Sequence, residues 1–314
     1  MSVFTTVTPE QLRLWLQDYQ LGELLELKGI AAGITNTNYF VTTSSARYVL
    51  TLFEHNSADE LPYFLNLMAH LAGHGVPCPH PVANCKGNYL GEINGKPAAL
   101  VSCLRGSSIG APSTYHCAQV GTALAHMHLA SLAFPATLEN PRGPSWCISA
   151  ASKVLQLLKA SEREQLQTEL AYQAGFHSID LPRGVIHADL FRENVLFDGH
   201  ELGGLIDFYY ACNDVLAYDL AITVNDWCVN TDGTLDMPRT QAMLEAYEAI
   251  RPLSDAERNA LPSLLRTAAL RFWLSRLLDM HFPQPGELTF AKDPTHFQRV
   301  LQARISGPTQ WQKP

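Results

Sequence analysis

The sequence lacks any uninterrupted apolar run of about 18 residues, the length that a membrane-spanning helix needs. It has no cluster of basic residues, and its formal net charge is −8, which argues against a nucleic-acid partner. The first residues do not combine a basic segment with an apolar one, so we expect no secretory signal and predict a cytoplasmic protein.

Cysteine is sparse, with seven residues in 314 and no C-x-x-C pair. This excludes the patterns of a disulfide framework or a zinc site. Cys78-Pro-His80 holds metal-binding residue types, but its spacing fits no common site. His126 and His128 lie two positions apart and cannot share one helix face, so packing is the preferred interpretation for both. Idle or buried thiols in a reducing compartment are the simplest interpretation of the cysteines.

The chain also lacks the G-x-x-x-x-G-K-[ST] phosphate-binding motif and any internal repeat. Hydrophobic residues make up 46% of the sequence and charged residues 17%, which is typical of a globular protein. The length allows two lobes with a sizeable core.

The most informative stretch covers residues 184–207. A short apolar run leads into a polar loop with His187, Asp189 and Asn194 in the order H-x-D-x-x-x-x-N, and Asp207 follows the next apolar runs. This order is typical of a kinase catalytic loop followed by a metal-binding aspartate. The alternative is a polar turn between two buried strands, whose carboxylates are only solvated caps.

Phosphoryl transfer explains these residue types. A carboxylate must orient the attacking hydroxyl and accept its proton, and we assign this role to Asp189. Hard oxygen ligands must hold magnesium at the phosphates, and Asn194 and Asp207 supply an amide oxygen and a carboxylate. His187 is expected to brace the loop rather than to react.

The first hundred residues predict an antiparallel sheet with one inserted helix. Thr8-Pro-Glu-Gln11 predicts a capped helix start, and Asn94-Gly95 predicts a tight hairpin. The expected strands are 24–29, 38–43, 47–53, 89–93 and 96–103, and the expected inserted helix is 58–73. Gly33, Asn36 and Asn38 between the first two strands could lie over phosphates, although an ordinary β-turn explains them as well.

Residues 104–113 form the best linker, and the pattern beyond it is mostly helical. The predicted helices are 114–131, 150–174, 215–230, 236–250, 255–280 and 290–303. We therefore predict an α+β, bilobal, protein-kinase-like fold. Residues 1–104 would form a small nucleotide-binding β lobe, and 105–314 a larger, mainly helical lobe with the catalytic loop and the substrate site. A nucleotide would bind in the cleft between lobes.

The chain resembles the aminoglycoside-phosphotransferase and choline-kinase superfamily over nearly its whole length. Within that superfamily it is most similar to the bacterial homoserine kinases of this fold, which are unrelated to those of the GHMP type. The resembling segments are 33–40, 48–54, 187–195, 225–228 and 269–276.

The resemblance implies an ATP- and Mg²⁺-dependent enzyme that phosphorylates the hydroxyl of L-homoserine in threonine biosynthesis. It implies that Asp219 tethers the catalytic loop, and that adenine bonds to the backbone near Ser102 and Leu104. Oligomeric state and feedback regulation are not implied.

The chain departs from the kinase pattern in three places. Thr51 stands where kinases of this fold usually carry a phosphate-binding Lys or Arg on the third strand; it is either a weak phosphate ligand or only a sheet residue. Glu60 therefore has no usual partner. Phe191 replaces the lysine of protein Ser/Thr kinases, and no glycine follows Asp207. The last two departures favour a small-molecule kinase.

Homoserine carries an ammonium and a carboxylate, so its site needs a carboxylate and a cation. Asp226 and Arg271 are our candidates, with Tyr209 as a pocket wall. The alternatives are solvation of Asp226 on a helix surface and a structural ion pair of Arg271. Choline, methylthioribose or an aminoglycoside could replace homoserine as substrate, and a nucleotide-binding pseudokinase is a different class of function.

Overall fold

The computed structural model describes residues 5–30, 36–176, 180–283 and 292–307. The chain divides into two compact units, each with its own interior. The first unit consists of Met1–Gly106 and Gly203–Tyr209, and the second of Ser107–Leu202 and Tyr210–Pro314. The predicted boundary at residue 104 did not anticipate that a segment after the catalytic loop returns to the first unit. That nucleotide binding belongs to the first unit stays a prediction.

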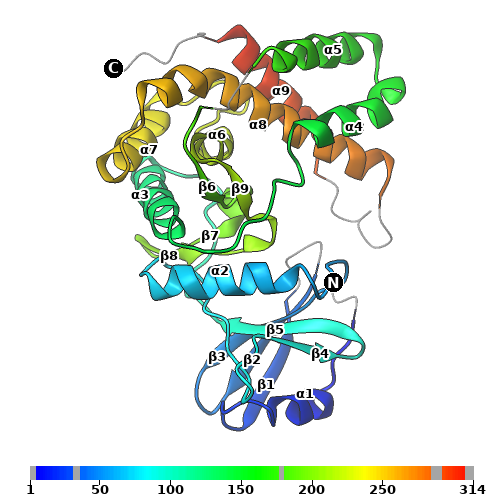
Figure 1. Ribbon diagram of the computed structural model, residues 1–314, viewed down its shortest axis with the longest axis vertical. Helices are drawn as coiled ribbons and strands as arrows, with labels where there is room; N and C mark the ends of the chain where they lie inside the picture. The colour runs from blue at the N-terminus through cyan, green and yellow to red at the C-terminus, as the bar shows by residue number, and fades with distance from the viewer. Residues whose placement is uncertain (1–4, 31–35, 177–179, 284–291, 308–314) are drawn as a thin grey trace. The chain divides into compact units, whose positions relative to one another are not determined.

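The first unit is built on a five-stranded antiparallel sheet in the order β1-β2-β3-β5-β4 (Figure 1). Its strands are β1 (Leu24–Gly29), β2 (Thr37–Thr43), β3 (Arg47–Leu52), β4 (Leu90–Ile93) and β5 (Lys96–Ser102). Its helices are α1 (Pro9–Leu16) and α2 (Leu61–Gly73). The predicted sheet with one inserted helix is therefore confirmed.

Alternation along the strands separates the two faces of this sheet. Leu50 and Leu52 join the core cluster that contains Leu12 and Leu16 of α1. Phe53 points the opposite way and meets Tyr209, which also contacts Phe64 of α2. Each helix thus covers its own face of the sheet.

The predicted local signals of this unit are present. The Thr8 side chain accepts from the backbone of Gln11, and the Gln11 side chain accepts from the backbone of Thr8, which is a complete capping box. Asn94 and Gly95 both have positive φ, at 53° and 73°, as a two-residue hairpin of type I′ requires.

The second unit is mainly helical, with two short two-stranded sheets. Its helices are α3 (Thr114–Ser131), α4 (Pro144–Val154), α5 (Ala160–Ala174), α6 (Leu216–Trp227), α7 (Met237–Ile250), α8 (Asp255–His281) and α9 (Pro294–Ser306). Its strands pair β6 (Arg183–Ile186) with β9 (Cys212–Val215), and β7 (Val195–Asp198) with β8 (Glu201–Leu205), whose last residues belong to the first unit.

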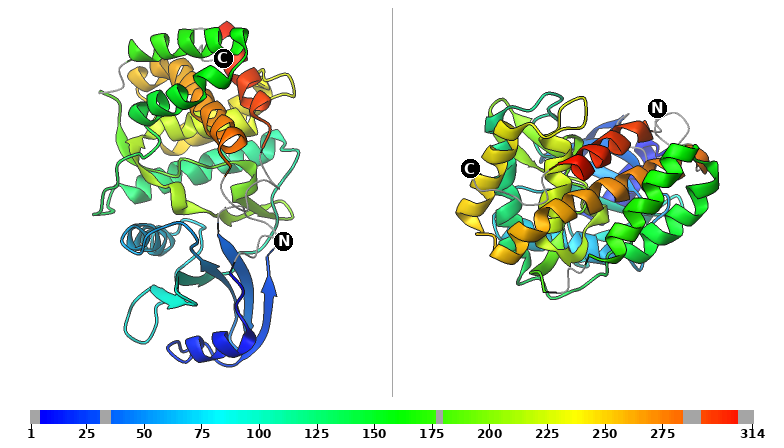
Figure 2. Two further views of the ribbon diagram at one scale, coloured as in Figure 1. Left: turned by 90° about the vertical axis from the view of Figure 1, so that its right-hand side faces the viewer. Right: turned by 90° about the horizontal axis from the view of Figure 1, so that it is seen from above.

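Helix α8 contacts α4, α6 and α9. Figure 2 shows α8, in orange, next to the red α9. Helices α3 and α7 pack along each other. Gly121 permits this approach, because a Cβ there would lie 2.3 Å from the carbonyl oxygen of Met243.

The predicted helix at 150–174 is wrong in its continuity. The chain forms α4, a 3₁₀ turn η1 (Leu155–Leu157) and then α5. Leu158 has ψ 151°, and the backbone N–H of Lys159 donates to the Glu162 side chain, which begins a new helix. The Arg163 side chain donates to the carbonyls of Leu155 and Leu158. These carbonyls, which a continuous helix would have paired with its own backbone, thus keep hydrogen-bond donors.

Two other helices begin later than the sequence predicts. Helix α2 begins at Leu61 rather than 58, with Pro62 in its first turn. Helix α9 begins at Pro294, capped by Asp293, and the predicted start at Phe290 lies outside the described residues. Within the described part of the chain, every helix is too short or too polar to cross a bilayer.

Candidate functional site

The predicted catalytic loop follows β6 and ends in η2 (Arg192–Asn194), after which β7 begins. Ala188 has φ 62°, a conformation that costs a non-glycine residue about 1–3 kcal/mol. Such a conformation persists only where the surroundings hold it, and hydrogen bonds from α6 supply that support.

Asp219 of α6 ties down the start of the loop. Its carboxylate accepts the backbone N–H of His187 at 2.6 Å and of Ala188 at 2.9 Å. The side chains of Asp219 and His187 are fully buried. This is the tether that the family resemblance implies, and it leaves His187 in the bracing role expected for it.

Burial works to raise the pKa of Asp219. The hydrogen bond from His128 and the charges and N–H groups nearby outweigh it, so the pKa lies below its ordinary value. The carboxylate is therefore held ionised in the interior.

A buried chain of hydrogen bonds continues from this carboxylate. His128 Nε2 lies 3.1 Å from Asp219 and its Nδ1 lies 2.7 Å from the Tyr247 hydroxyl. Arg251 donates to that hydroxyl and, at 2.7 Å, to Glu257. The chain links α3, α6, α7 and α8 beneath the loop, and His128 is satisfied by packing, as predicted.

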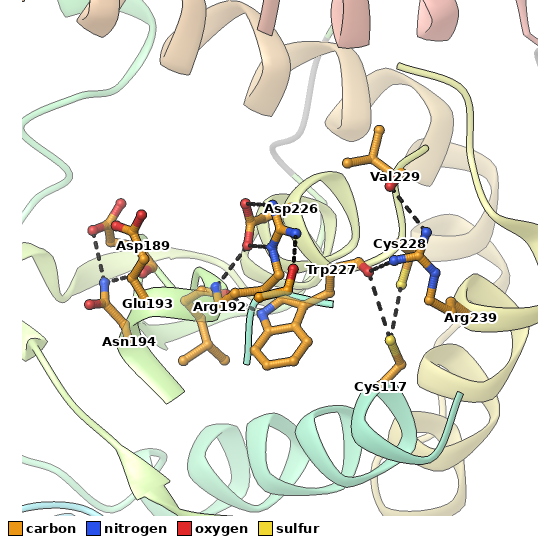
Figure 3. Close-up of polar contacts among 12 residues, drawn as sticks. Cys117, Asp189, Arg192, Glu193, Asn194, Asp226, Trp227, Cys228, Val229 and Arg239 are labelled. Atoms are coloured by element: carbon orange, nitrogen blue, oxygen red, sulfur yellow. Dashed lines mark hydrogen bonds and ion pairs between the residues drawn. The ribbon is translucent and has the colours of Figure 1, made fainter. Parts of the chain in front are cut away.

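Asp189 and Asn194 lie side by side in the loop (Figure 3). Asn194 Nδ2 donates to the Asp189 carbonyl at 2.8 Å and to its carboxylate at 3.1 Å. Because the amide nitrogen is used in this way, the amide oxygen is directed away and is available as a ligand. Asp189 keeps 20% of its side chain exposed, so its carboxylate is accessible to a substrate.

Asp226 braces the same loop from the far end of α6 (Figure 3). Its carboxylate accepts the backbone N–H of Arg192 at 2.7 Å and the Arg192 side chain at 3.1 Å. Trp227 Nε1 donates to the carbonyl of Leu190. Since Arg192 already occupies the Asp226 carboxylate, a bracing role explains its burial better than the predicted contact with a substrate ammonium.

Phe191, where protein kinases carry lysine, is buried against aromatic rings. Its ring centre lies 4.5 Å from that of Phe272 in α8 and 5.8 Å from that of Phe297 in α9. The loop is thus supported by apolar packing on its α8 side.

Arg271 of α8 lies beside Asp189, with 3.9 Å between Nη1 and Oδ1, and is only 4% exposed. Its guanidinium stacks on Phe272. Arg142, which precedes α4, lies near the same site, and burial together with the charge of Arg271 lowers its pKa despite the opposing charge of Tyr210. Two cations thus lie near Asp189, and a role of Arg271 in binding a substrate carboxylate stays a prediction.

The first unit holds the other predicted metal ligand and the strand position of Thr51. Asp207 is exposed and has φ 64°, a strained conformation for a non-glycine residue. The Thr51 hydroxyl donates to Asn38 at 2.8 Å and shares a hydrogen bond with Tyr209. Thr51 therefore has the contacts of a sheet residue. Burial raises the pKa of Tyr209, with the charge of Asp207 adding to the effect.

The predicted nucleotide contacts are placed in part. The Asn36 side chain is buried and accepts from the backbone of Glu54, and Asn38 donates to the carbonyl of Asn36. The backbone N–H of Ser102 donates to the His80 carbonyl, and its hydroxyl accepts from the His80 backbone, while the Leu104 carbonyl accepts from the Cys103 thiol. The adenine contacts at Ser102 and Leu104 stay predictions. Gly33 lies outside the described residues.

Three residues of this site were not predicted from sequence: Arg142, Arg192 and His128 in its role as a partner of Asp219. Arg142 lies in a loop between two prolines, which carries no motif. His128 was predicted to be satisfied by packing, without a named partner. The contacts that bring these three residues to the site join positions far apart in the sequence. No local sequence pattern could therefore have identified them.

The donor set fits a hard divalent cation. Asn194 and Asp207 supply oxygen ligands of the kind that Mg²⁺ prefers. Among the described residues, no three His, Cys, Asp or Glu side chains converge as a self-contained metal cage. That Asn194 and Asp207 hold a magnesium ion stays a prediction.

Comparison with known proteins agrees with this geometry. Residues 26–253 match the phosphotransferase enzyme family. A homoserine kinase of Methylobacillus flagellatus is 60% identical over 310 residues, covering 99% of this chain and 97% of the relative.

Solved structures share the fold at low identity. An amicoumacin kinase in complex with AMP-PNP, Ca²⁺ and Ami has a TM-score of 0.71 at 12% identity, covering 95% of this chain and 94% of that one. Choline kinase of Cryptosporidium parvum has a TM-score of 0.61 at 15% identity, covering 90% and 89%. The predicted α+β kinase-like fold is confirmed, and the chain belongs to the phosphotransferase enzyme family of small-molecule kinases.

Proposed function

We propose that this protein is a homoserine kinase that transfers the γ-phosphoryl group of ATP to the side-chain hydroxyl of L-homoserine. The full-length similarity to homoserine kinases supports the substrate. The observation that carries the chemistry is Asp189, an accessible carboxylate held in a loop that Asp219 and Asp226 brace from one helix.

The transfer requires only ATP and homoserine as reactants. The homoserine hydroxyl oxygen attacks the γ-phosphorus, and the bond from that phosphorus to the bridging oxygen of ADP breaks. Asp189 orients the hydroxyl and accepts its proton. The products are O-phospho-L-homoserine and ADP.

Asn194 and Asp207 would hold Mg²⁺, which would neutralise charge on the phosphate oxygens. The orientation of Asn194 supports its part, because Asp189 receives its Nδ2 hydrogens and leaves the amide oxygen for a cation. Thr51 carries no charge, so neutralisation of the phosphates depends on the cation more than in kinases with a strand lysine. We place the reaction in threonine biosynthesis, in the cytoplasm.

A substrate panel tests the assignment. Purified protein is incubated with Mg-ATP and L-homoserine, choline, methylthioribose or kanamycin, and ADP release is measured. We expect efficient turnover with L-homoserine alone. Turnover with only another alcohol would reassign the substrate, and ATP binding without turnover on any alcohol would indicate a pseudokinase.

The variant Asp189→Asn tests the role of the carboxylate. We expect kcat to fall by about 10³-fold, because the amide orients a hydroxyl but accepts no proton. ATP affinity, measured by calorimetry, should change little. A variant with near-normal kcat would remove Asp189 as the base.

Asn194→Ala should instead raise the Mg²⁺ concentration needed for half-maximal rate.

A further inference from the structure

Arg271 is a buried charged side chain, only 4% exposed, whose Nη1 has no hydrogen-bond acceptor among the residues that the structure describes. A buried donor without an acceptor costs about 1–3 kcal/mol. The ion pair of Nη1 with Asp189, at 3.9 Å, is too long to be a hydrogen bond. The guanidinium therefore indicates a place for an anion.

Arg142 supplies a second cation at this place. The guanidinium carbons of Arg142 and Arg271 each lie 5.8 Å from the centre of the Tyr210 ring. Arg142 also stacks on Trp146 and donates one long hydrogen bond of 3.4 Å to Ser275, which lies one turn after Arg271 on α8. Two different segments thus bring their cations to one aromatic ring.

The electrostatics of the pair favour an added negative charge. Burial lowers the pKa of Arg142, and the charge of Arg271 lowers it further, while Tyr210, Asp279 and Asp189 oppose the shift. Two partly desolvated cations repel each other, and an anion bound to both removes that repulsion. A carboxylate matches the planar guanidinium in two parallel hydrogen bonds.

We propose that Arg142 and Arg271 together bind the α-carboxylate of the amino-acid substrate and so determine its specificity. This inference rests on the proposed function. Three carbon atoms separate the hydroxyl of homoserine from its carboxylate carbon. The Arg271 Nη1 lies 3.9 Å from Asp189, so one short substrate can contact both residues. Alcohols without a carboxylate leave both cations unsatisfied and are rejected.

The test compares L-homoserine with 3-aminopropan-1-ol, which lacks only the carboxylate. The kcat/KM of each is measured for wild type, Arg142→Met and Arg271→Met. We expect wild type to prefer homoserine by about 100-fold, as charge-assisted hydrogen bonds to a buried group provide. Each variant should lose most of that preference, because its kcat/KM should fall much further for homoserine than for the aminoalcohol.

Arg258→Met is the matched control, because Arg258 lies on the same helix but pairs with Glu248. It should keep the wild-type preference. Arg271→Lys, which keeps the charge but not the fork, should recover only part of it.

The outcomes separate the two claims. If Arg142→Met and Arg271→Met lower kcat/KM by the same factor for homoserine and for the aminoalcohol, the inference is overturned. The arginines would then act on ATP or on Asp189. A wild-type enzyme that phosphorylates other alcohols but not L-homoserine would overturn the proposed function itself.

Discussion

Two buried charges flank the catalytic loop, and they differ in how they are satisfied. Asp219 on α6 accepts two backbone N–H groups and a hydrogen bond with His128, which itself continues to Tyr247. Arg271 on α8 is equally enclosed, yet its Nη1 donates to none of the described residues. Both are within reach of the loop, one through the backbone of His187 and the other through Asp189.

This difference in hydrogen bonding distinguishes a charge that stabilises the fold from a charge that binds a ligand. A buried ion with all its hydrogen-bond partners in the fold has its desolvation offset before any ligand arrives. A buried ion without them stays costly until a ligand supplies the partner. The comparison predicts opposite effects of removing the two charges on stability.

Asp219→Ala should have the largest effect on stability. It leaves two backbone N–H groups of the loop and one nitrogen of His128 without their acceptor, which costs about 3–5 kcal/mol. Urea unfolding monitored by tryptophan fluorescence measures the loss, and kcat should fall as the loop loses its position. A loss below about 1 kcal/mol would show that Asp219 does not hold the loop.

Arg271→Met should change stability in the other direction. Methionine replaces a buried cation by an apolar chain of similar length, which is neutral or stabilising by about 1–4 kcal/mol. The ion pair that is lost is long, at 3.9 Å, and the Nη1 atom has no hydrogen-bond acceptor to lose. The melting temperature of the ligand-free protein should therefore stay or rise, while that of Arg266→Met, which breaks the pair with buried Glu169, should fall. Strong destabilisation by Arg271→Met would mean that the contacts of Arg271 with Asp189 and Phe272 stabilise the fold.

Protonation of Asp219 at low pH should have the smallest effect on stability. The folded pKa of Asp219 lies below its ordinary value of 3.8, so its contribution is present above that pH and is lost as the pH falls through the lower folded value. Each unit of the depression corresponds to about 1.4 kcal/mol. The stability gap between wild type and Asp219→Asn should be constant from pH 7 to 5 and shrink below about pH 4. A gap that shrinks above pH 5 would contradict the depressed pKa.

Much of the fold follows from short-range pattern. The strands at 24–29 and 47–52 follow from short strand-like runs in the sequence, and the start of α1 after Thr8 follows from a capping box whose partners are three residues apart. The break near Leu158 was missed because both flanking segments are good helix formers, and the interruption depends on caps formed across the turn.

The spacing of His187, Asp189 and Asn194 determined the candidate chemistry without coordinates, because these residues act within one loop and their order defines their relative positions. The tertiary structure alone showed that Asp226 is occupied by Arg192, and that Arg142 meets Arg271 at Tyr210. Whether a buried charge has a partner depends on residues far apart in the sequence, 34 positions for Arg192 and Asp226 and 91 for His128 and Asp219, and no local spacing contains that information.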